Sequence, residues 1–413
     1  MKYGCIGENL SHSFSKEIHK ELADYEYECV ELAPNELEEF IRSKDFEAIN
    51  VTIPYKEKVV PYIDILDESA ESIGAVNTIV NRDGLLYGYN TDFYGMSELI
   101  RHAGASLTDK KVLVLGTGGT SRTACAVALA EGAREVVCVS RKPKGDKISY
   151  ADAEKKHKDT EIIINTTPVG MYPRIFGKPI SLKPFPKLEC VIDVVYNPIR
   201  TPLVLAARER GINATGGLYM LVAQGVRASE LFLGKKYDRS VTNSVYSKIL
   251  HDKTNIVLVG MPSCGKSEVG RIIAEKLGRE LLDTDKLAEE LTGKSVEQIF
   301  NDRGEDVFRD VESLVTDRAS AKCGVVIATG GGTVLRRANV GGLRENGRIY
   351  FIDRPLELLS ATSDRPTAST KEALINLYSS RYALYRGAAT RVIDGSGTPE
   401  EVADMIIEDF LKA

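Results

Sequence analysis

Two glycine-rich segments constrain this chain more than any other feature. Residues 116–122 follow the apolar run 112–115, and residues 260–267 follow the apolar run 256–259. Each segment leads directly into a run with helical character. A strand, a glycine turn and a helix in this order form the phosphate-binding start of a βαβ unit. Because this start occurs twice, far apart along the chain, the sequence predicts two separate α/β domains.

Length and composition agree with this division. The chain has 413 residues, which exceeds the roughly 100–200 residues of most single domains. Hydrophobic residues make up 43% and charged residues 27%, as is ordinary for globular proteins. The net charge of −5 argues against a broad surface for nucleic acid or anionic membranes. We therefore expect small-molecule ligands and no nucleic-acid or membrane partner, and a homo-oligomer is compatible with the sequence.

The cysteines and the N-terminus bear on the cellular location. The seven cysteines are scattered and form neither a C-x-x-C pair nor a Cys/His cluster. We expect them to be reduced and mostly buried. No charged start followed by an apolar segment precedes the first strand-like run, and no apolar stretch reaches the roughly 18–20 residues of a membrane span. The sequence therefore predicts a cytoplasmic protein.

Alternating strand-like and helix-like runs give the domain boundaries. They cover residues 1–92, restart at residue 111 with a pattern typical of a parallel, doubly wound sheet, and end in helical runs up to residue 250. The pattern starts again at residue 254. We expect one domain at 1–250 and another at 254–413. Within the first, residues 93–217 form a Rossmann dinucleotide-binding part, and residues 1–92 with about 218–250 form the other part.

The second glycine segment fits the pattern G-x-x-x-x-G-K-[ST]. Its backbone N–H groups and the following helix N-terminus favour phosphate groups. Lys266 is expected to reach the transferred phosphate, and the Ser267 hydroxyl is expected to bind Mg²⁺. The segment predicts an ATP site without naming the acceptor. The predicted ATP-binding residues here are Gly260, Ser263, Cys264, Gly265, Lys266 and Ser267.

Three further motifs follow in the same half. Alternation along an extended segment predicts that the carboxylates of Asp283 and Asp285 point to one side, where one holds the metal and the other accepts a proton. The alternative is a solvated turn. Arg309 and Glu312 are expected on one helix face, where the guanidinium binds a substrate carboxylate; an ordinary surface ion pair is the alternative. Residues 329–332 predict a wall of backbone amides.

Together these motifs, in this order and spacing, resemble shikimate kinase from residue 254 to the C-terminus. The resemblance implies a P-loop NTPase fold like that of nucleoside monophosphate kinases. It also implies that Asp285 is the catalytic base, beside Asp283 at Mg²⁺, and that Arg365 belongs to a lid over the ATP phosphates. Thr367 and Ala383 depart from the residues usual near this lid and near the later arginine. The substrate contacts that it implies are Asp285, Arg309, Gly331, Gly332 and Arg381.

The first glycine segment predicts a dinucleotide site. Its third glycine is replaced by Ser121, but the strand and helix around it place a pyrophosphate at the helix N-terminus. The next strand ends in Ser140, Arg141 and Lys142, without the acidic residue that binds a free ribose 2′-hydroxyl. A cation here suits a 2′-phosphate, which favours NADP over NAD. The alternative is a basic surface loop.

Polar residues after two strand-like runs suggest a reaction centre in residues 1–92. Lys56 ends the segment N-V-T-I-P-Y-K, and Asp92 ends N-T-D. Reduction of a ring ketone needs a proton donor beside the developing alkoxide, and a lysine held by an aspartate meets that need. Either residue alone would more often be a surface charge.

The combination of these motifs with H-S-F-S at 12–15, G-A-V-N-T at 74–78, Y-N-P at 196–198 and G-L-Y-M-L-V-A-Q at 217–224 resembles shikimate dehydrogenase. The resemblance spans nearly all of residues 1–250 and implies that Lys56 and Asp92 are catalytic. Lys16 departs from the usual proline. The implied substrate contacts are Ser13, Ser15, Thr52, Asn77, Asp92, Tyr196 and Gln224. The implied NADP(H) contacts are Gly116, Gly118, Gly119, Thr120, Ser121, Ser140, Arg141, Lys142 and Gly217.

The two resemblances share one metabolite. They imply an enzyme of chorismate biosynthesis that reduces 3-dehydroshikimate with NADPH and then phosphorylates shikimate with ATP and Mg²⁺. One alternative is an NAD-dependent quinate/shikimate dehydrogenase joined to a kinase of another small polyol acid. A second is a non-catalytic metabolite sensor, against which the intact Lys56, Asp92, Lys266 and Asp285 speak.

Overall fold

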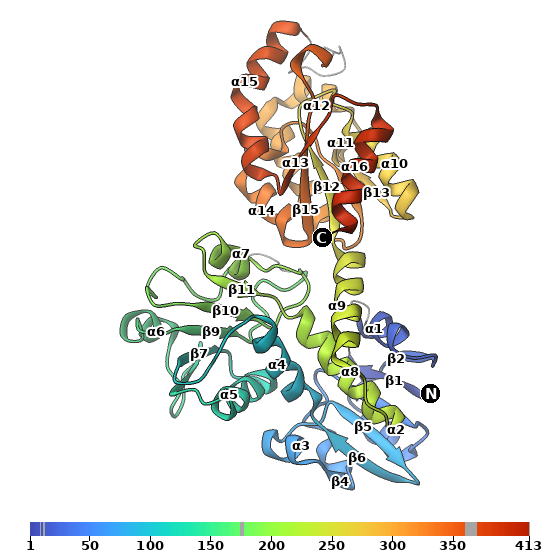
Figure 1. Ribbon diagram of the computed structural model, residues 1–413, viewed down its shortest axis with the longest axis vertical. Coiled ribbons are helices and arrows are strands. Elements are labelled where there is room, and N and C mark those ends of the chain that lie inside the picture. Colours follow the sequence, from blue (N-terminus) through green and yellow to red (C-terminus); the bar gives the residue numbers. More distant parts are fainter. Residues whose placement is uncertain (9, 11–12, 174–176, 360–369, 413) are drawn as a thin grey trace. The chain divides into compact units, whose positions relative to one another are not determined.

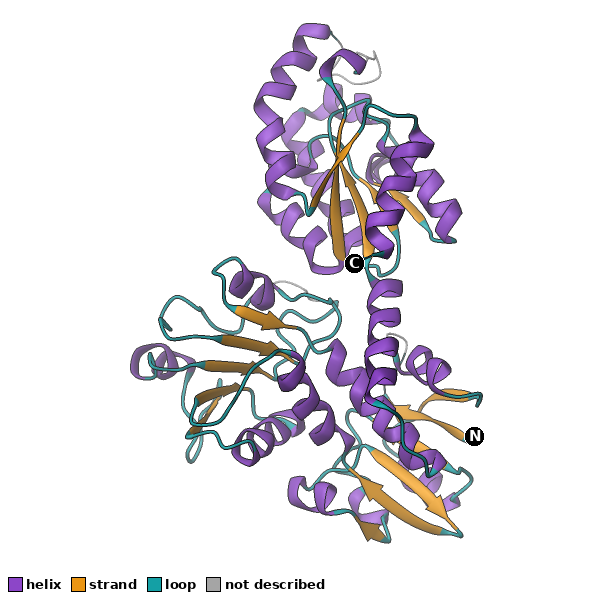
Figure 2. Ribbon diagram, viewed as in Figure 1, coloured by secondary structure: helices purple, strands orange, loops and turns teal. Residues whose placement is uncertain are grey.

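The computed structural model describes residues 1–8, 10, 13–173, 177–359 and 370–412 (Figure 1). The chain divides into two compact units, Met1–Ile249 and Leu250–Ala413. Helix α9 (Arg239–Lys253) runs through the point of division. In the described residues each unit contains both helices and strands, as Figure 2 shows. The predicted α/β fold class is confirmed.

The first sheet lies in the N-terminal part of the first unit. Its strand order is β2-β1-β3-β5-β6-β4, with β2, β1 and β3 parallel and with β5 antiparallel to both β3 and β6. Helices α1 to α3 lie between its strands in the sequence. The elements are β1 (Tyr3–Gly7), α1 (Ser15–Leu22), β2 (Tyr27–Glu31), α2 (Leu37–Ser43), β3 (Ala48–Val51), η1 (Val60–Tyr62), β4 (Ile65–Leu66), α3 (Glu68–Ile73), β5 (Thr78–Arg82) and β6 (Leu85–Tyr89).

The second sheet carries the first glycine turn. It is parallel throughout, with the order β11-β10-β9-β7-β8. Side chains alternate along β7, so Val112 and Val114 enter one apolar core while Leu113 and Leu115 enter another on the opposite face. The elements are β7 (Lys111–Leu115), α5 (Gly119–Ala130), β8 (Glu135–Val139), α6 (Tyr150–Lys156), β9 (Ile162–Asn165), β10 (Cys190–Asp193), α7 (Pro202–Arg208) and β11 (Asn213–Thr215).

This strand order locates the ligand edge. The chain reverses its direction of winding between β7 and β9, which are neighbours in the sheet but are separated by β8 in the sequence. Doubly wound sheets bind ligands beyond the carboxyl ends of the strands at such a switch point. The glycine turn at residues 116–119 directly follows β7 and therefore lies at this edge.

Helices α4 (Thr91–His102) and α8 (Leu218–Leu233) join the two sheets of the first unit. They pack against each other so closely that a Cβ atom on Gly95 would lie 2.8 Å from the carbonyl oxygen of Met220. Leu99 and Ala223 enter the core of the second sheet, while Phe232 enters a core with β1 and β2. The two lobes of this unit therefore share continuous helices.

The third sheet forms the second unit. It is parallel, with the order β13-β14-β12-β15-β16 and an apolar core on each face. The elements are β12 (Asn255–Val259), α10 (Lys266–Leu277), β13 (Leu281–Asp283), α11 (Thr284–Thr292), α12 (Val296–Arg303), α13 (Glu305–Ser320), β14 (Val326–Ala328), η2 (Thr333–Leu335), α14 (Arg337–Asn346), β15 (Gly347–Asp353), η3 (Leu356–Leu358), α15 (Lys371–Ala388), β16 (Arg391–Asp394) and α16 (Pro399–Leu411).

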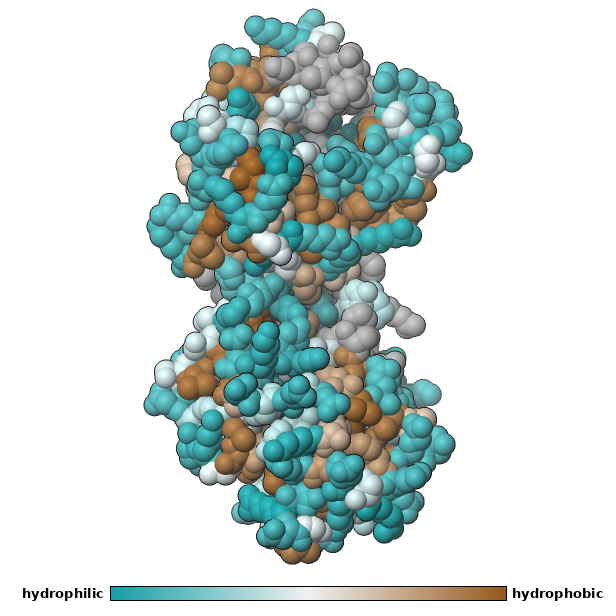
Figure 3. Space-filling model, turned by 90° about the vertical axis from the view of Figure 1, so that its right-hand side faces the viewer, coloured by the Kyte–Doolittle hydropathy of each residue, from teal (hydrophilic) through white to brown (hydrophobic). Residues whose placement is uncertain are grey.

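Hydrophilic residues cover much of the face in Figure 3, with hydrophobic residues in scattered groups between them. In the described part of the chain, none of the helices has both the length and the apolar character that a bilayer crossing requires.

Candidate active sites

The lysine and the aspartate singled out in the first unit lie in direct contact. Nζ of Lys56 donates a hydrogen bond to Oδ2 of Asp92 over 2.6 Å. Lys56 follows β3 in a loop, and Asp92 lies in the first turn of α4, where a carboxylate also interacts favourably with the helix N-terminus. The side chains of Lys56 and Asp92 are 25% and 11% exposed. This is a sheltered pair and not two separate surface charges.

Asn77 fixes the other oxygen of the aspartate. Its Nδ2 group donates to Oδ1 of Asp92 over 2.9 Å and to Oγ1 of Thr91 over 3.0 Å, while its Oδ1 accepts from the Thr91 N–H over 2.7 Å. Asn90 caps α4 by accepting from the Asp92 N–H. The side chain of Gln224, on α8, lies 3.4 Å from the Thr91 hydroxyl. This polar network holds Oδ1 of Asp92, and Lys56 contacts the other carboxylate oxygen, Oδ2.

The remaining predicted substrate contacts in this unit come from three elements. Ser13 and Ser15 lie at the start of α1 with their hydroxyl oxygens 3.0 Å apart. Thr52 follows β3, and its N–H donates to Ile6. Tyr196 follows β10, where burial raises the pKa of its hydroxyl to about 12 and keeps it neutral. Its ring packs edge-on against the ring of Phe14, which lies between the two serines.

The first glycine turn has the close approaches that require glycine. Gly116 has a φ of +114°, and a Cβ atom there would lie 2.7 Å from Oγ1 of Thr166, which follows the neighbouring strand β9. Gly118 caps α5, and the space where its Cβ atom would stand is open. Ser121, in place of a third glycine, is buried and donates to the carbonyl of Gly116 over 2.8 Å. The serine thereby stabilises the turn; Thr120 beside it is half-buried.

Other predicted dinucleotide contacts surround this turn. Arg141 and Lys142 are exposed just beyond β8, where the Lys142 N–H donates to the hydroxyl of Ser140. Gly217 is the N-cap of α8, and a Cβ atom there would lie 2.0 Å from the carbonyl oxygen of Val194. No larger residue fits at Gly217 without movement of the backbone.

The second glycine turn wraps a buried lysine. Gly260 and Gly265 have φ values of +155° and +93°, and Ser263 between them has a φ of +64°. Lys266 begins α10, and its ammonium donates to the carbonyl oxygens of Gly260 over 3.0 Å and of Met261 over 2.9 Å. These bonds hold the ammonium inside the loop. The phosphate groups of ATP are expected to bind in the same loop. Cys264 is buried behind the loop, 3.7 Å from the ammonium.

The D-T-D segment differs from the expectation in its backbone. The prediction of one extended segment is wrong, because β13 ends at Asp283 and α11 begins at Thr284. Oδ1 of Asp283 caps this helix by accepting from the N–H groups of Asp285 and Lys286. Local hydrogen bonding by the aspartate therefore overrides strand alternation. Both carboxylates nevertheless line the same pocket.

The donor set at the end of the second glycine turn fits a small hard cation. The Ser267 hydroxyl donates to Oδ2 of Asp283 over 2.6 Å, so two oxygen ligands already lie together. Mg²⁺ prefers one or two protein oxygens, with water and phosphate oxygens completing its shell. Among the described residues, no cluster of three or more His, Cys, Asp or Glu side chains is arranged to hold a metal ion.

Arg309 and Glu312 form a buried pair on α13. The two side chains are 8% and 2% exposed, and Nη1 of Arg309 donates to Oε2 of Glu312 over 2.8 Å. The same guanidinium also contacts Glu305 at 2.8 Å and stands over the ring of Phe308. The alternative of a surface ion pair is therefore excluded for Glu312. The other oxygen of Glu312 accepts from the Thr333 hydroxyl over 3.0 Å.

Gly331 and Gly332 line the same pocket beside the arginines. The carbonyl of Gly331 accepts from Nη1 of Arg381 over 3.1 Å and from the hydroxyl of Tyr385, both on α15. Arg381 is buried, and its bond to Gly331 agrees with the rule that arginine is almost never fully buried without a partner. Arg365, expected in the lid, lies outside the described residues.

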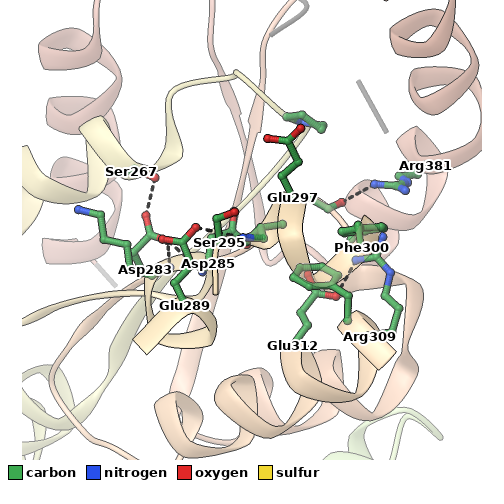
Figure 4. Close-up of a pocket in the computed structure, with 16 residues that line it drawn as sticks. Ser267, Asp283, Asp285, Glu289, Ser295, Glu297, Phe300, Arg309, Glu312 and Arg381 are labelled. Carbon is green, nitrogen blue, oxygen red and sulfur yellow. Dashed lines mark hydrogen bonds and ion pairs between the residues drawn. The ribbon is translucent and has the colours of Figure 1, made fainter. Parts of the chain in front are cut away.

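These groups surround one cavity of about 310 Å³. Figure 4 shows Ser267, Asp283 and Asp285 on one side of it, and the guanidinium groups of Arg309 and Arg381 on the other. Carboxylates therefore lie beside the phosphate loop, and two guanidinium groups lie at the far end, where Glu297 and Glu312 also line the cavity. A small molecule with a hydroxyl at one end and a carboxylate at the other matches this distribution of charge.

Sequence reasoning missed several residues that hold these sites. Tyr385 lies one helical turn after Arg381, so the i, i+4 spacing on α15 was a signal for it. The hydroxyl of Thr284 accepts from the N–H of Gly330, and the ion pair of Arg122 with Glu57 joins α5 to the loop that carries Lys56. No local pattern marks these last two contacts, because each links distant segments.

The fold and sites define the class of protein: a dinucleotide-binding α/β unit with a lysine–aspartate pair, followed by a P-loop phosphotransferase unit. The family model described as shikimate kinase matches residues 262–411, and the model described as shikimate dehydrogenase substrate binding domain matches residues 5–79. The chain therefore belongs to the shikimate dehydrogenase family and carries a shikimate kinase domain in its second unit. It is a bifunctional shikimate-pathway enzyme.

Relatives and solved structures agree over the first unit. A protein of Clostridium perfringens named shikimate dehydrogenase (NADP(+)) is 37% identical over 265 residues, covering 60% of this chain and 97% of the relative. The structure of shikimate dehydrogenase 1 from Peptoclostridium difficile has a TM-score of 0.56 and 33% identity, with coverage of 60% and 98%. A chorismate mutase/shikimate 5-dehydrogenase fusion protein from Clostridium acetobutylicum has a TM-score of 0.57 and 31% identity, with coverage of 60% and 96%.

Proposed function

We propose that the first unit reduces the ring ketone of 3-dehydroshikimate to shikimate. The contact between Lys56 and Asp92 carries this proposal. The Lys56 ammonium donates a proton to the oxygen that becomes the hydroxyl, and Asp92 orients the ammonium. Asn77 holds Asp92 through its second oxygen, so the carboxylate keeps its position as the proton moves. Bound NADPH supplies the hydride.

The polar groups near this pair fit a polyol acid. The paired hydroxyls of Ser13 and Ser15 suit the substrate carboxylate as donors, and Tyr196 offers a neutral hydroxyl. Thr52 and Gln224 bind ring hydroxyls in this proposal. These residues bind and orient the ring, and they leave proton transfer to Lys56.

For the cofactor we propose NADP(H) over NAD(H). The pyrophosphate binds at the N-terminus of α5, where Gly118 and Gly119 leave room and the helix favours negative charge. Exposed Arg141 and Lys142 at the end of β8 bind the ribose 2′-phosphate. Curated relatives named for NADP(+) support this preference.

We propose that the second unit phosphorylates the 3-hydroxyl of shikimate with ATP. Asp285 accepts the proton of that hydroxyl, and Lys266 with the loop amides binds the transferred phosphate. Arg309 and Arg381 bind the substrate carboxylate at the far end of the cavity, and backbone groups of Gly331 and Gly332 face the ring. Ser267 and Asp283 would hold Mg²⁺, which neutralises phosphate charge.

A coupled assay tests both halves. The purified chain is incubated with 3-dehydroshikimate, NADPH, ATP and Mg²⁺, and the products are identified by mass. We expect NADPH consumption, ADP release and a phosphorylated shikimate. Replacing NADPH with NADH tests the cofactor preference. Supplying shikimate or quinate with ATP and Mg²⁺ alone tests the second unit and its substrate independently of the first. Loss of one activity alone would reject the proposal for that unit only.

A further inference from the structure

Two of the seven cysteines lie together. Cys125 on α5 and Cys138 on β8 have their sulfur atoms 3.0 Å apart, and both are free thiols. Both side chains are partly exposed, so a small reagent has access to the pair. A disulfide bond requires a separation of about 2.05 Å. The two thiols are therefore about 1 Å from bonding distance, which a small movement of α5 against β8 supplies.

Each cysteine of the pair lies close, along its own helix or strand, to a residue of the proposed dinucleotide site. On α5, Cys125 is four residues after Ser121 and shares its helix face, and Ser121 anchors the glycine turn through the carbonyl of Gly116. On β8, Cys138 is two residues before Ser140 and points to the same face of the strand. Arg141 follows next. Cys125 is thus one helical turn from Ser121, and Cys138 is two residues along the strand direction from Ser140. Both serines are assigned to the cofactor site.

The surroundings activate one of the two thiols. The hydrogen bond between the two sulfurs, in which either thiol can donate, lowers the pKa of Cys138, with Lys147 acting in the same direction and burial and Asp146 opposing it. The same hydrogen bond, with burial, raises the pKa of Cys125. The thiolate is the reactive form in thiol–disulfide exchange, so the thiol that accepts this hydrogen bond attacks first, and we assign that role to Cys138.

We propose that Cys125 and Cys138 form a redox-active dithiol whose disulfide weakens dinucleotide binding. The oxidant is a low-molecular-weight disulfide such as glutathione disulfide. The Cys138 thiolate attacks one of its sulfurs and expels a thiolate, which takes up a proton. Cys125 then gives its proton to solvent, attacks the Cys138 sulfur and expels the second thiolate. Two protein thiols are oxidised to one disulfide, and one small disulfide is reduced to two thiols.

The effect on binding follows from what the bond would connect. In this proposal, closing the sulfur separation moves α5, which begins at the glycine turn, toward β8, which ends two residues before Arg141. A misplacement of about 1 Å can cost about 100-fold in catalytic rate, and we expect a smaller loss of about tenfold in dinucleotide binding. This part of the inference rests on the dinucleotide site proposed above, whereas disulfide formation does not depend on it.

The first experiment follows the bond itself. The full chain is equilibrated in glutathione and glutathione disulfide mixtures, free thiols are alkylated, and peptides are analysed by mass. We expect one intramolecular disulfide joining Cys125 to Cys138, reversed by dithiothreitol. Cys29→Ser, which removes an exposed thiol, is the control and should form the same bond. Cys125→Ser should instead accumulate a glutathione adduct on Cys138. Free Cys125 and Cys138 in the wild type at high glutathione disulfide would overturn the proposal.

The second experiment measures NADP⁺ binding by the reduced and the oxidised chain. We expect the dissociation constant to rise about tenfold on oxidation and to recover with dithiothreitol. By linkage, saturating NADP⁺ should then raise the midpoint potential of the dithiol by about 30 mV. A disulfide that leaves both quantities unchanged would overturn the coupling. A reduced chain that binds no NADP⁺ would overturn the coupling and the proposed cofactor together, while the disulfide itself would still be seen by mass.

Discussion

A Cβ atom on Gly332 would lie 1.8 Å from Nη1 of Arg309. A side chain at position 332 would therefore displace the guanidinium of Arg309, which lies 23 positions earlier in the sequence and is anchored by Glu312. The guanidinium occupies the space that any other residue at this position would fill. This contact sets the far end of the cavity in the second unit.

Gly332→Ala should displace Arg309 and weaken shikimate binding. We expect the KM for shikimate to rise about tenfold or more, since a lost charge-assisted hydrogen bond costs about 1.5–3 kcal/mol. Steady-state kinase assays at saturating ATP measure this. Gly341→Ala, on α14 with open space around it, is the matched control and should leave KM unchanged. An unchanged KM in Gly332→Ala would contradict the assignment of Arg309.

Lys56→Ala and Lys266→Ala should separate the two activities. Loss of the Lys56 ammonium should lower dehydrogenase kcat by about 10²–10⁴-fold, the usual contribution of a general acid. Kinase activity of that variant should be unchanged, and Lys266→Ala should show the reverse pattern. Lys58→Ala, an exposed lysine two residues from Lys56, serves as the control. A variant that lost both activities would argue against independent sites.

Arg141→Ala tests the cofactor assignment. We expect the KM for NADPH to rise about tenfold while the KM for NADH stays constant, because only the former carries the 2′-phosphate. Initial rates with each nucleotide provide the measurement. Lys155→Ala removes an exposed cation from α6 of the same lobe and should affect neither value. Equal changes for both nucleotides would instead indicate a general electrostatic role.

Removal of divalent cations should affect one activity only. We expect EDTA to abolish ADP formation and to leave NADPH oxidation intact, since Mg²⁺ is assigned to Ser267 and Asp283 alone. Asp283→Asn should raise the Mg²⁺ concentration at half-maximal kinase rate by about tenfold, because the carboxylate charge is lost. The Mg²⁺ titration of Glu290→Gln, an exposed acidic residue of α11, is the comparison. Identical titrations would contradict the metal assignment.

Glu345 should make the second unit less stable as the pH rises. Burial, with a smaller contribution from Asp317, raises the pKa of Glu345 from 4.5 to about 8. Its Oε2 atom has no hydrogen-bond partner among the described residues. The pKa of Glu345 is higher in the folded state than in the unfolded state. Its contribution to the stability of the second unit is therefore fully present below about pH 4.5 and is lost as the pH rises through about 8.

Glu345→Gln removes this ionisation at nearly constant shape. We expect the variant to gain about 1–2 kcal/mol of opening free energy at pH 8 and much less at pH 5. Hydrogen exchange of peptides from α13 and α14, corrected for intrinsic rates, measures it. Glu290→Gln should show no such gain. A gain of equal size at both pH values would attribute the effect to packing and not to the carboxyl proton.

Much of the fold was readable from local patterns. The apolar runs at residues 112–115 and 256–259, each expected to be a strand before a glycine turn, were confirmed within β7 and β12. Both are short, fully buried runs that end at a glycine turn. The extended D-T-D segment was wrong because the Asp283 carboxylate caps α11, and a side chain bonding to nearby N–H groups competes with strand structure.

The sequence alone determined the two glycine turns, the positions of their strands and helices, and the chemical types of residue at each site. These depend on short-range backbone geometry, so neighbouring residues encode them. The tertiary structure decided which side chains meet: Asn77 with Asp92, Gly332 with Arg309, and Cys125 with Cys138. Such contacts arise only when sheet order and helix packing bring distant segments together, because the free energy of burial depends on the whole fold.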